Sequence, residues 1–364
     1  MFNKSLYIGL MSGTSADGID AALVHIDTDH IQLLDFITFP SQLKNELITL
    51  NHQPQISLTK LAQLHAQVAE EFAQASLQII SQNGFEPAHI QAIGSHGQTL
   101  YHAPELGMSL QIGHPAIIAK RTGIQTAADF RPDDMALGGQ GAPLAPAFHQ
   151  QLFDQNNKTH CVINIGGIAN ISLLRPDQAP LGFDTGPGNC LMDEVCQLHF
   201  DEDYDRAGQR AAQADVDPAL LRHLLADPYF SQPAPKSTGR ETFNQAWLLK
   251  HIQQPIEPNQ LISTLNQLTV ETLAQALESL KLPANSLCTI CGGGAYNLTL
   301  LNRLQTRLPG LVIQTSQQYN IDPNAIEAMM CAWLAYQRIE HLEINLTQIT
   351  GAQRPAILGG LWHP

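Results

Sequence analysis

The chain has 364 residues, which at about 150 residues per domain predicts two domains, and its 44% hydrophobic content excludes global disorder. Its formal net charge of −14, without any Lys/Arg-rich run, argues against a nucleic-acid partner. The N-terminus lacks a secretory pattern and no apolar run approaches the roughly 18 residues that cross a bilayer, so we expect a cytoplasmic protein with no membrane partner.

Apolar runs and glycine-rich turns alternate from the N-terminus onward. Residues 6–10 (LYIGL), the turn MSGTSADG and the run IDAALVHID predict a strand, a turn and a second strand. A helix is predicted over 61–79, where apolar residues recur at helical spacing, and Gly84 ends it. Residues 161–174 repeat the first plan, with CVINI, Gly166-Gly167 and IANISLL. The repeated hairpin suggests two related domains, with chance similarity as the alternative.

Two further helices are predicted toward the C-terminus. One covers 261–280 and ends before Pro283, and the other begins near Asp322-Pro323 and runs to Ile339. Alternating strands and helices indicate an α/β protein. We expect a first lobe over 1–128 and a second over 129–339, with a tail of about 340–364 that returns to the first.

The six cysteines show no disulfide framework and fit reduced thiols. Cys288 and Cys291 form a C-x-x-C in the apolar run SLCTICGGG. A redox or metal role stays open for this pair, but no second cysteine pair stands at a zinc-site spacing. We therefore expect two buried cysteines in a strand.

Three glycine-bearing turns follow predicted strands, and such turns let a phosphate approach bare backbone. They are MSGTSADG, Gly166-Gly167 and Gly292-Gly293-Gly294. The first is neither a Walker A loop nor a dinucleotide fingerprint, because no lysine follows its glycines and a strand comes next. Asp17 and Asp20 beside it could ligate hydrated Mg²⁺ or only stabilise the turn.

Polar residues between glycines supply the candidate chemistry. Asp184, in GFDTGPGN, is expected at a strand end, as a base or as a cap of the following helix. Ser95 and Gln98 lie in GSHGQT, where His96 is expected to be an ordinary hydrogen-bonded histidine. Arg131 could bind a ligand carboxylate or pair with neighbouring aspartates. Glu327 could reach the site or favour the dipole of its helix.

Seven segments spread over the full chain are distinctive when taken together: GLMSGTSADGID, GSHGQT, ADFRPDDMALGGQGAPL, NIGGIANIS, GFDTGPGN, KSTGRE and ICGGGAYN. In this order they resemble the anhydro-N-acetylmuramic acid kinases. Ala16 stands where many members have a bulkier apolar residue. The resemblance implies the two-lobed actin/hexokinase/Hsp70-like (ribonuclease H-like) α/β fold, with ATP and substrate in the interdomain cleft.

The resemblance also implies an activity and its residues. The enzyme would use ATP and Mg²⁺ to open 1,6-anhydro-N-acetylmuramic acid with water and phosphorylate O6, giving N-acetylmuramic acid 6-phosphate in peptidoglycan recycling. Asp184 matches the catalytic base. The sugar would contact Ser95, Gln98, Arg131 and Glu327, and Asp17 would meet Mg²⁺, directly or through water. The ATP contacts would be Ser12, Gly13, Thr14, Ser15, Ala16, Asp17, Gly18, Ile19, Gly166, Gly167, Asn170, Gly292, Gly293 and Gly294.

Two other functions stay open at this point. An ordinary sugar kinase would use Asp184 to activate a free hydroxyl, and activity only on a sugar with a free 6-hydroxyl would favour it. A nucleotide-switched binding module like Hsp70 would need a partner-binding domain, for which two lobes leave no room in 364 residues. A homodimer stays open as the assembly.

Overall fold

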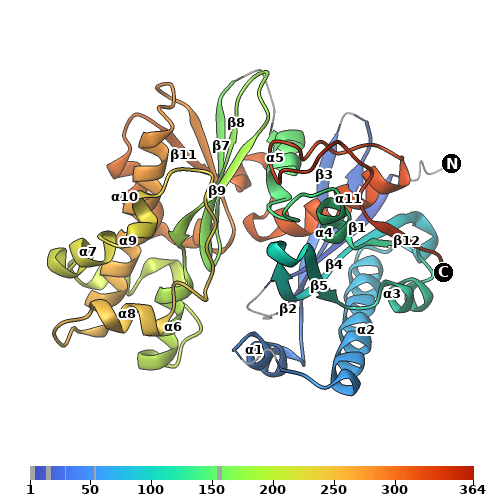
Figure 1. Cartoon of the computed structure of the whole chain (residues 1–364), viewed down its shortest axis with the longest axis horizontal. Helices are drawn as coiled ribbons and strands as arrows, with labels where there is room; N and C mark the ends of the chain where they lie inside the picture. Colours follow the sequence, from blue (N-terminus) through green and yellow to red (C-terminus); the bar gives the residue numbers. More distant parts are fainter. Residues whose placement is uncertain (1–4, 14–17, 29, 53–54, 154–157) are drawn as a thin grey trace. The chain divides into compact units, whose positions relative to one another are not determined.

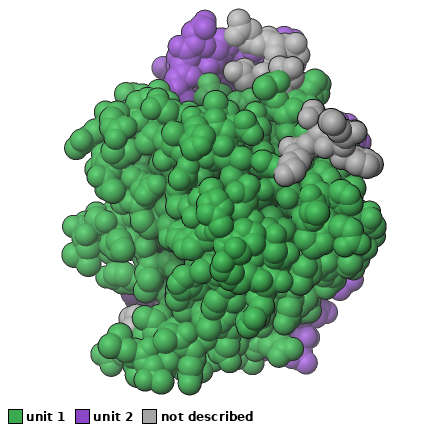
Figure 2. All heavy atoms as spheres, turned by 90° about the vertical axis from the view of Figure 1, so that its right-hand side faces the viewer, with its two compact units in different colours: residues 1–152, 324–364 green, residues 153–323 purple. Residues whose placement is uncertain are grey.

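The computed structural model describes residues 5–13, 18–28, 30–52, 55–153 and 158–364. The chain forms two compact units, one of residues 1–152 and 324–364 and the other of residues 153–323. Figure 2 shows the atoms of unit 1 as one continuous body, although they come from both ends of the chain.

Unit 1 contains a mixed sheet in the order β12-β6-β4-β1-β2-β3, with β5 also paired to β4 (Figure 1). Its strands are β1 Leu6–Ser12, β2 Gly18–Ile26, β3 Ile31–Pro40, β4 Ile90–Ala103, β5 Met108–Ile112, β6 Thr126–Ala128 and β12 Gly360–Trp362. Strands β1, β2 and β3 are antiparallel neighbours, whereas β4 runs parallel to β1 and β6 runs parallel to β4.

Helices cover both faces of this sheet. They are α1 Lys44–His52, α2 Leu58–Gln82, α3 Pro115–Thr122, α4 Phe130–Ala136, α5 Ala145–Phe153 and α11 Ile326–Ile339. The predicted stripe of α2 is confirmed, since Leu64, Val68 and Phe72 pack in one core with Ile8 and Leu10 of β1. The Ser57 side chain begins α2 by accepting a hydrogen bond from the Lys60 backbone N–H.

Unit 2 contains a second mixed sheet in the order β11-β10-β7-β8-β9. Its strands are β7 His160–Ile165, β8 Ile168–Leu174, β9 Leu181–Pro187, β10 Leu287–Cys291 and β11 Val312–Thr315. Its helices are α6 Cys190–Phe200, α7 Pro218–Leu225, α8 Gln245–His251, α9 Pro258–Ser279 and α10 Leu298–Arg307. The helix expected over 261–280 is therefore α9, whose buried face contributes to the core of this unit.

The two sheets repeat one plan. In each, an antiparallel three-stranded meander is followed by two parallel strands on the side of its first strand: β3-β2-β1-β4-β6 and β9-β8-β7-β10-β11. The β1–β2 and β7–β8 turns, both rich in glycine, therefore occupy equivalent places in the two units. This agrees with the repeated hairpin in the sequence.

The unit boundaries differ from those expected from the sequence. Residues 129–152 and 324–339 belong to unit 1, as do residues 340–364. Helix α11 packs against β1 and β4, and β12 pairs with β6, so tertiary contacts bring the C-terminal part of the chain into this unit. A 3-10 turn, Pro323–Ala325, precedes α11.

All six cysteines are buried, and none of them forms a disulfide bond. Cys288 and Cys291 both lie in β10, which fits the expectation of buried strand cysteines. Among the described residues, no helix is both long and apolar enough to cross a membrane.

Helix α11 lies in backbone contact with the sheet at two glycines. Gly9 of β1 and Gly94 of β4 are register partners. A Cβ at Gly9 would lie 1.7 Å from the Ala328 carbonyl oxygen, and one at Gly94 would lie 1.8 Å from that of Cys331. Neither contact can be relieved by rotating a side chain, because both partner atoms are backbone.

We therefore expect Gly9→Ala to lower the free energy of unfolding by about 3 kcal/mol, because the added methyl group must push α11 off the sheet. Urea denaturation followed by tryptophan fluorescence measures the loss, since Trp333 lies in α11. Gly310→Ala is the matched control: its Cβ would meet nothing within 4 Å, so a change below about 0.5 kcal/mol is expected. Equal urea midpoints for the two variants would contradict this packing.

Candidate functional site

The β1–β2 turn is held from β4 by a buried glutamine. Ser12 Oγ lies 2.7 Å from Gln98 Oε1 and 3.0 Å from the Gly18 carbonyl oxygen. Gln98 Nε2 donates to the Gly13 carbonyl oxygen at 3.1 Å. Both ends of the Gln98 amide are therefore used to fix the β1 side of the turn at Ser12 and Gly13, and Ser12 in turn contacts Gly18 on the β2 side. The predicted contacts Thr14, Ser15, Ala16 and Asp17 lie outside the described residues.

The start of β2 is packed against β3. Ile19 is buried in the core of unit 1, so its side chain is not available to a ligand. The Asp20 carboxylate accepts a hydrogen bond from Thr38 Oγ1 at 2.6 Å and thereby ties β2 to β3. Within the described ranges, no three His, Cys, Asp or Glu side chains cluster as a metal site, and the candidate Asp17 falls outside those ranges.

Arg131, in α4, is held by neutral partners. Its Nε donates to His96 Nε2 at 2.9 Å and its Nη1 donates to the Gly141 carbonyl oxygen at 2.8 Å. Burial and the adjacent Arg131 guanidinium lower the pKa of His96 to about 3, although a hydrogen bond with the Gly97 backbone opposes this shift. The imidazole ring therefore stays neutral. The expected ion pair of Arg131 with adjacent aspartates is not among the ion pairs of the described residues.

Glu327 lies in the first turn of α11 and acts on Arg131 electrostatically. Burial lowers the pKa of Arg131, and the negative charge of Glu327 is the largest influence that opposes this shift. Arg131 and Glu327, predicted from distant segments, therefore belong to one electrostatic cluster in unit 1. The position of Glu327 in the first helical turn also suits the helix dipole, so the two expected roles are compatible.

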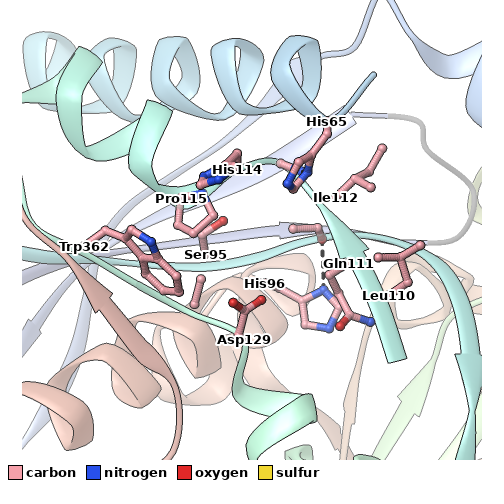
Figure 3. Close-up of a pocket in the computed structure, with 13 residues that line it drawn as sticks. His65, Ser95, His96, Leu110, Gln111, Ile112, His114, Pro115, Asp129 and Trp362 are labelled. Carbon is pink, nitrogen blue, oxygen red and sulfur yellow. Dashed lines mark hydrogen bonds between the residues drawn. The ribbon is translucent and has the colours of Figure 1, made fainter. Parts of the chain in front are cut away.

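Ser95 lines a cavity of about 190 Å³ in unit 1 (Figure 3). Its side chain is 1% exposed, and its Oγ has no hydrogen-bond partner among the described residues. A buried hydroxyl without a partner costs about 1–3 kcal/mol, which a bound polar group would recover.

The glycine turns of unit 2 lie close together. A Cβ at Gly292 would lie 2.3 Å from Asn164 Oδ1, and one at Gly294 would lie 2.3 Å from Ile165 Cγ2, so the triple glycine packs directly on the end of β7. Gly292 also has a φ of 75°, which favours glycine. The Gly166 carbonyl oxygen accepts from the Asn189 backbone N–H at 2.8 Å. Gly166, Gly167, Gly292, Gly293 and Gly294 are thus brought to one edge of the sheet.

Asp184 lies within β9 and not at its end, which corrects the sequence-based expectation. The strand continues to Pro187 because β8 pairs with it up to that residue. Nor does Asp184 cap the following helix, since Asn189 is the N-cap residue of α6. Asn170, a predicted ATP contact, is the register partner of Asp184 on β8.

The Asp184 carboxylate is oriented by the loop at 236–238. Its Oδ2 accepts from the Thr238 backbone N–H at 2.9 Å and from Ser237 Oγ at 3.0 Å, while the Lys236 carbonyl oxygen accepts from the Asp184 backbone N–H. Burial raises the pKa of Asp184, and the two hydrogen bonds from Thr238 and Ser237 oppose that shift. Oδ1 has no hydrogen bond from the described residues, so one oxygen is held and the other is available.

Several site residues were not predicted from the sequence. Ser237 and Thr238 lie in KSTGRE, one of the segments that carry the resemblance, but no role was predicted for either residue. Arg240 of the same segment lies against the β7–β8 turn, where a Cβ at Gly167 would be 2.7 Å from its Nε. Trp362 also lines the unit 1 cavity, and its only signal in the sequence is its place two residues after the Gly359-Gly360 pair.

The model of the family described as "Anhydro-N-acetylmuramic acid kinase" matches residues 5–364. A relative of that name from Hydrogenovibrio crunogenus is 52% identical over 365 residues, covering 99% of both chains. One from Vibrio vulnificus is 44% identical, covering 100% of this chain and 99% of the relative. A solved activator of 2-hydroxyisocaproyl-CoA dehydratase from Clostridium difficile, with bound ADPNP, has a TM-score of 0.47 at 10% identity, covering 92% of this chain and 96% of that one. From the match along the whole sequence, the chain belongs to the anhydro-N-acetylmuramic acid kinase family.

Proposed function

We propose that this chain converts 1,6-anhydro-N-acetylmuramic acid, ATP and water into N-acetylmuramic acid 6-phosphate and ADP during peptidoglycan recycling. Family membership over residues 5–364 supports the substrate and the use of ATP. The observation that carries the mechanism is Asp184, a half-buried carboxylate with one oxygen held by two donors and the other available.

Asp184 is the general base of the proposed reaction. O6 of the substrate is bonded to C1, so no free 6-hydroxyl exists until that bond breaks. Asp184 Oδ1 takes one proton from water, and the water oxygen bonds to C1. The C1–O6 bond breaks, and O6 accepts the γ-phosphoryl group while ADP leaves. The second water proton stays on the new C1 hydroxyl, so atoms and charge balance.

The ATP contacts are assigned to the glycine turns. In unit 2, bare backbone at Gly166, Gly167 and Gly292–Gly294, with Asn170 nearby on β8, suits a nucleotide. In unit 1, the proposed contacts are Ser12, Gly13, Gly18, the backbone of Ile19, and Thr14–Asp17. Mg²⁺ would neutralise phosphate charge and keep most of its waters, so it needs few protein ligands. Asp17 is the proposed ligand, directly or through water.

The sugar contacts are assigned to unit 1. Arg131 uses Nε and Nη1 for His96 and Gly141, which leaves Nη2 to bind the lactyl carboxylate of the sugar. Ser95 offers its unpartnered hydroxyl, and Glu327 is a polar contact beside Arg131. Gln98 is proposed to act through the β1–β2 turn that it holds. We place the enzyme in the cytoplasm, where ATP is available, and a homodimer stays a prediction.

We expect Asp184→Asn to lower turnover by about 10²- to 10⁴-fold, because the amide cannot accept the proton of water. ADP release is measured with Mg-ATP and the anhydro-sugar, and solvent ¹⁸O is traced into the product. Wild-type enzyme should place the label at C1. Binding of ATP to the variant, measured by calorimetry, should be retained.

Asp177→Asn is the matched control for this experiment, because Asp177 is an exposed residue in the β8–β9 turn with a positive φ that asparagine also adopts. It should leave turnover unchanged. Full activity of Asp184→Asn would contradict its assignment as the base. ADP release only with a sugar that has a free 6-hydroxyl would contradict the proposed reaction and favour an ordinary sugar kinase.

Ser237→Ala should move the acidic limb of the pH–rate profile to higher pH. The Ser237 hydroxyl stabilises the charged carboxylate, so its removal raises the pKa of Asp184 further, and a base must be deprotonated to act. Activity at high pH should change little. An acidic limb that stays in place, or moves to lower pH, would show that a different group controls it.

A further inference from the structure

The unit 1 cavity has a floor of small residues. Gly94 of β4 is the register partner of Ala127 on β6, which is in turn the partner of Leu361 on β12. One residue further along, Ser95 and Ala128 line the cavity, and Ala128 is the register partner of Gly360. The row of Ser95, Ala128 and Gly360 carries no bulky side chain, so β4, β6 and β12 leave room for the cavity on this face of the sheet.

The indole of Trp362 forms a wall beside this floor. Figure 3 shows it near Ser95, Pro115 and Asp129. A Cβ at Gly360 would lie 2.6 Å from Trp362 Cη2, so the ring lies over the backbone of its own strand, and a larger residue at position 360 would displace it. The side chain of Trp362 is only half-buried, whereas Trp247 and Trp333 are 8% and 4% exposed.

Strand β12, which carries Trp362, is fixed by hydrogen bonds of both backbone groups of the preceding residue, Gly359. The Gly359 backbone N–H donates to Asp133 Oδ2 at 2.8 Å, and its carbonyl oxygen accepts from Arg338 Nε at 2.7 Å. Pairing of β12 with β6 adds to these bonds. The indole is therefore mounted on a rigid element and not on a free chain end.

The polar groups of the cavity suit an uncharged ligand. Neither lysine nor arginine is among the described residues that line it, and Asp129 adds a carboxylate. His65 Nδ1 accepts from the Gly113 backbone N–H, and His114 Nδ1 accepts from the Ala116 backbone N–H. In a neutral ring the proton is then on Nε2, so each histidine is a donor. Neutral donors with one carboxylate match hydroxyl or amide groups and disfavour a phosphate or carboxylate.

We propose that this cavity binds the uncharged face of the sugar substrate, with the pyranose ring stacked on Trp362 and a hydroxyl or amide group bonded to Ser95. The inference rests on the proposed function. It makes Trp362 a specificity-determining residue contributed by the C-terminal strand. The negatively charged lactyl group would lie outside this cavity, toward a cationic group such as Arg131.

Two measurements test the proposal on the full-length protein. Trp362→Ala should weaken binding of 1,6-anhydro-N-acetylmuramic acid about tenfold in calorimetry, with a similar rise in the KM for the sugar and no change in the KM for ATP. Trp362→Phe keeps an aromatic surface and should weaken binding only about twofold. In the wild type, the sugar should change the tryptophan emission, and Trp362→Phe should abolish that change.

Leu361→Ala is the matched control, because Leu361 lies on the same strand and its side chain points to the opposite face. It should bind the sugar as the wild type does. Sugar binding by a folded Trp362→Ala at wild-type strength, or an emission change that persists in Trp362→Phe, would overturn the inference while leaving the proposed function intact. If Trp362→Ala does not fold, the emission experiment on Trp362→Phe decides alone. A wild type that neither binds nor converts the anhydro-sugar would overturn both.

Discussion

Unit 1 depends on the close contact between α11 and the glycine pair of β1 and β4. Because Gly9 and Gly94 carry no Cβ, the helix lies against the sheet backbone at Ala328 and Cys331. This contact brings a helix from the end of the chain to strands from its beginning. The same contact sets the distance between the sheet and the first turn of α11, which carries Glu327, the residue that acts electrostatically on Arg131. A larger side chain at either glycine would separate elements that the site needs together.

Both charged groups at the centre of the proposed chemistry are held by neutral partners. Arg131 bonds a neutral histidine and a backbone carbonyl, and Asp184 accepts from a hydroxyl and a backbone N–H. Neutral partners orient a charged group but do not neutralise its charge, whereas a bound counter-ion would neutralise it. His96 can play this part because burial and the adjacent guanidinium lower its pKa to about 3. Each charge therefore remains available to a ligand or to a proton.

The repeated sheet plan gives the two units equivalent glycine turns with different supports. In unit 1 the β1–β2 turn is held by Gln98 from the neighbouring parallel strand. In unit 2 the β7–β8 turn bonds the segment that begins α6 and is approached by Arg240. The same architecture therefore provides the two glycine turns that we propose as phosphate contacts, and the side chains that support each turn differ.

The sequence by itself determined the local elements, because periodicity and turn chemistry act over neighbouring residues. The stripe of α2, the hairpins at Gly13–Gly18 and Gly166-Gly167, and the buried strand cysteines all follow from patterns a few residues long. Only the tertiary structure decided what meets across the chain. Ser237 reaches Asp184 across 53 residues, and Trp362 joins a cavity whose floor begins at Ser95. Such contacts depend on sheet order and close packing, which no local pattern encodes.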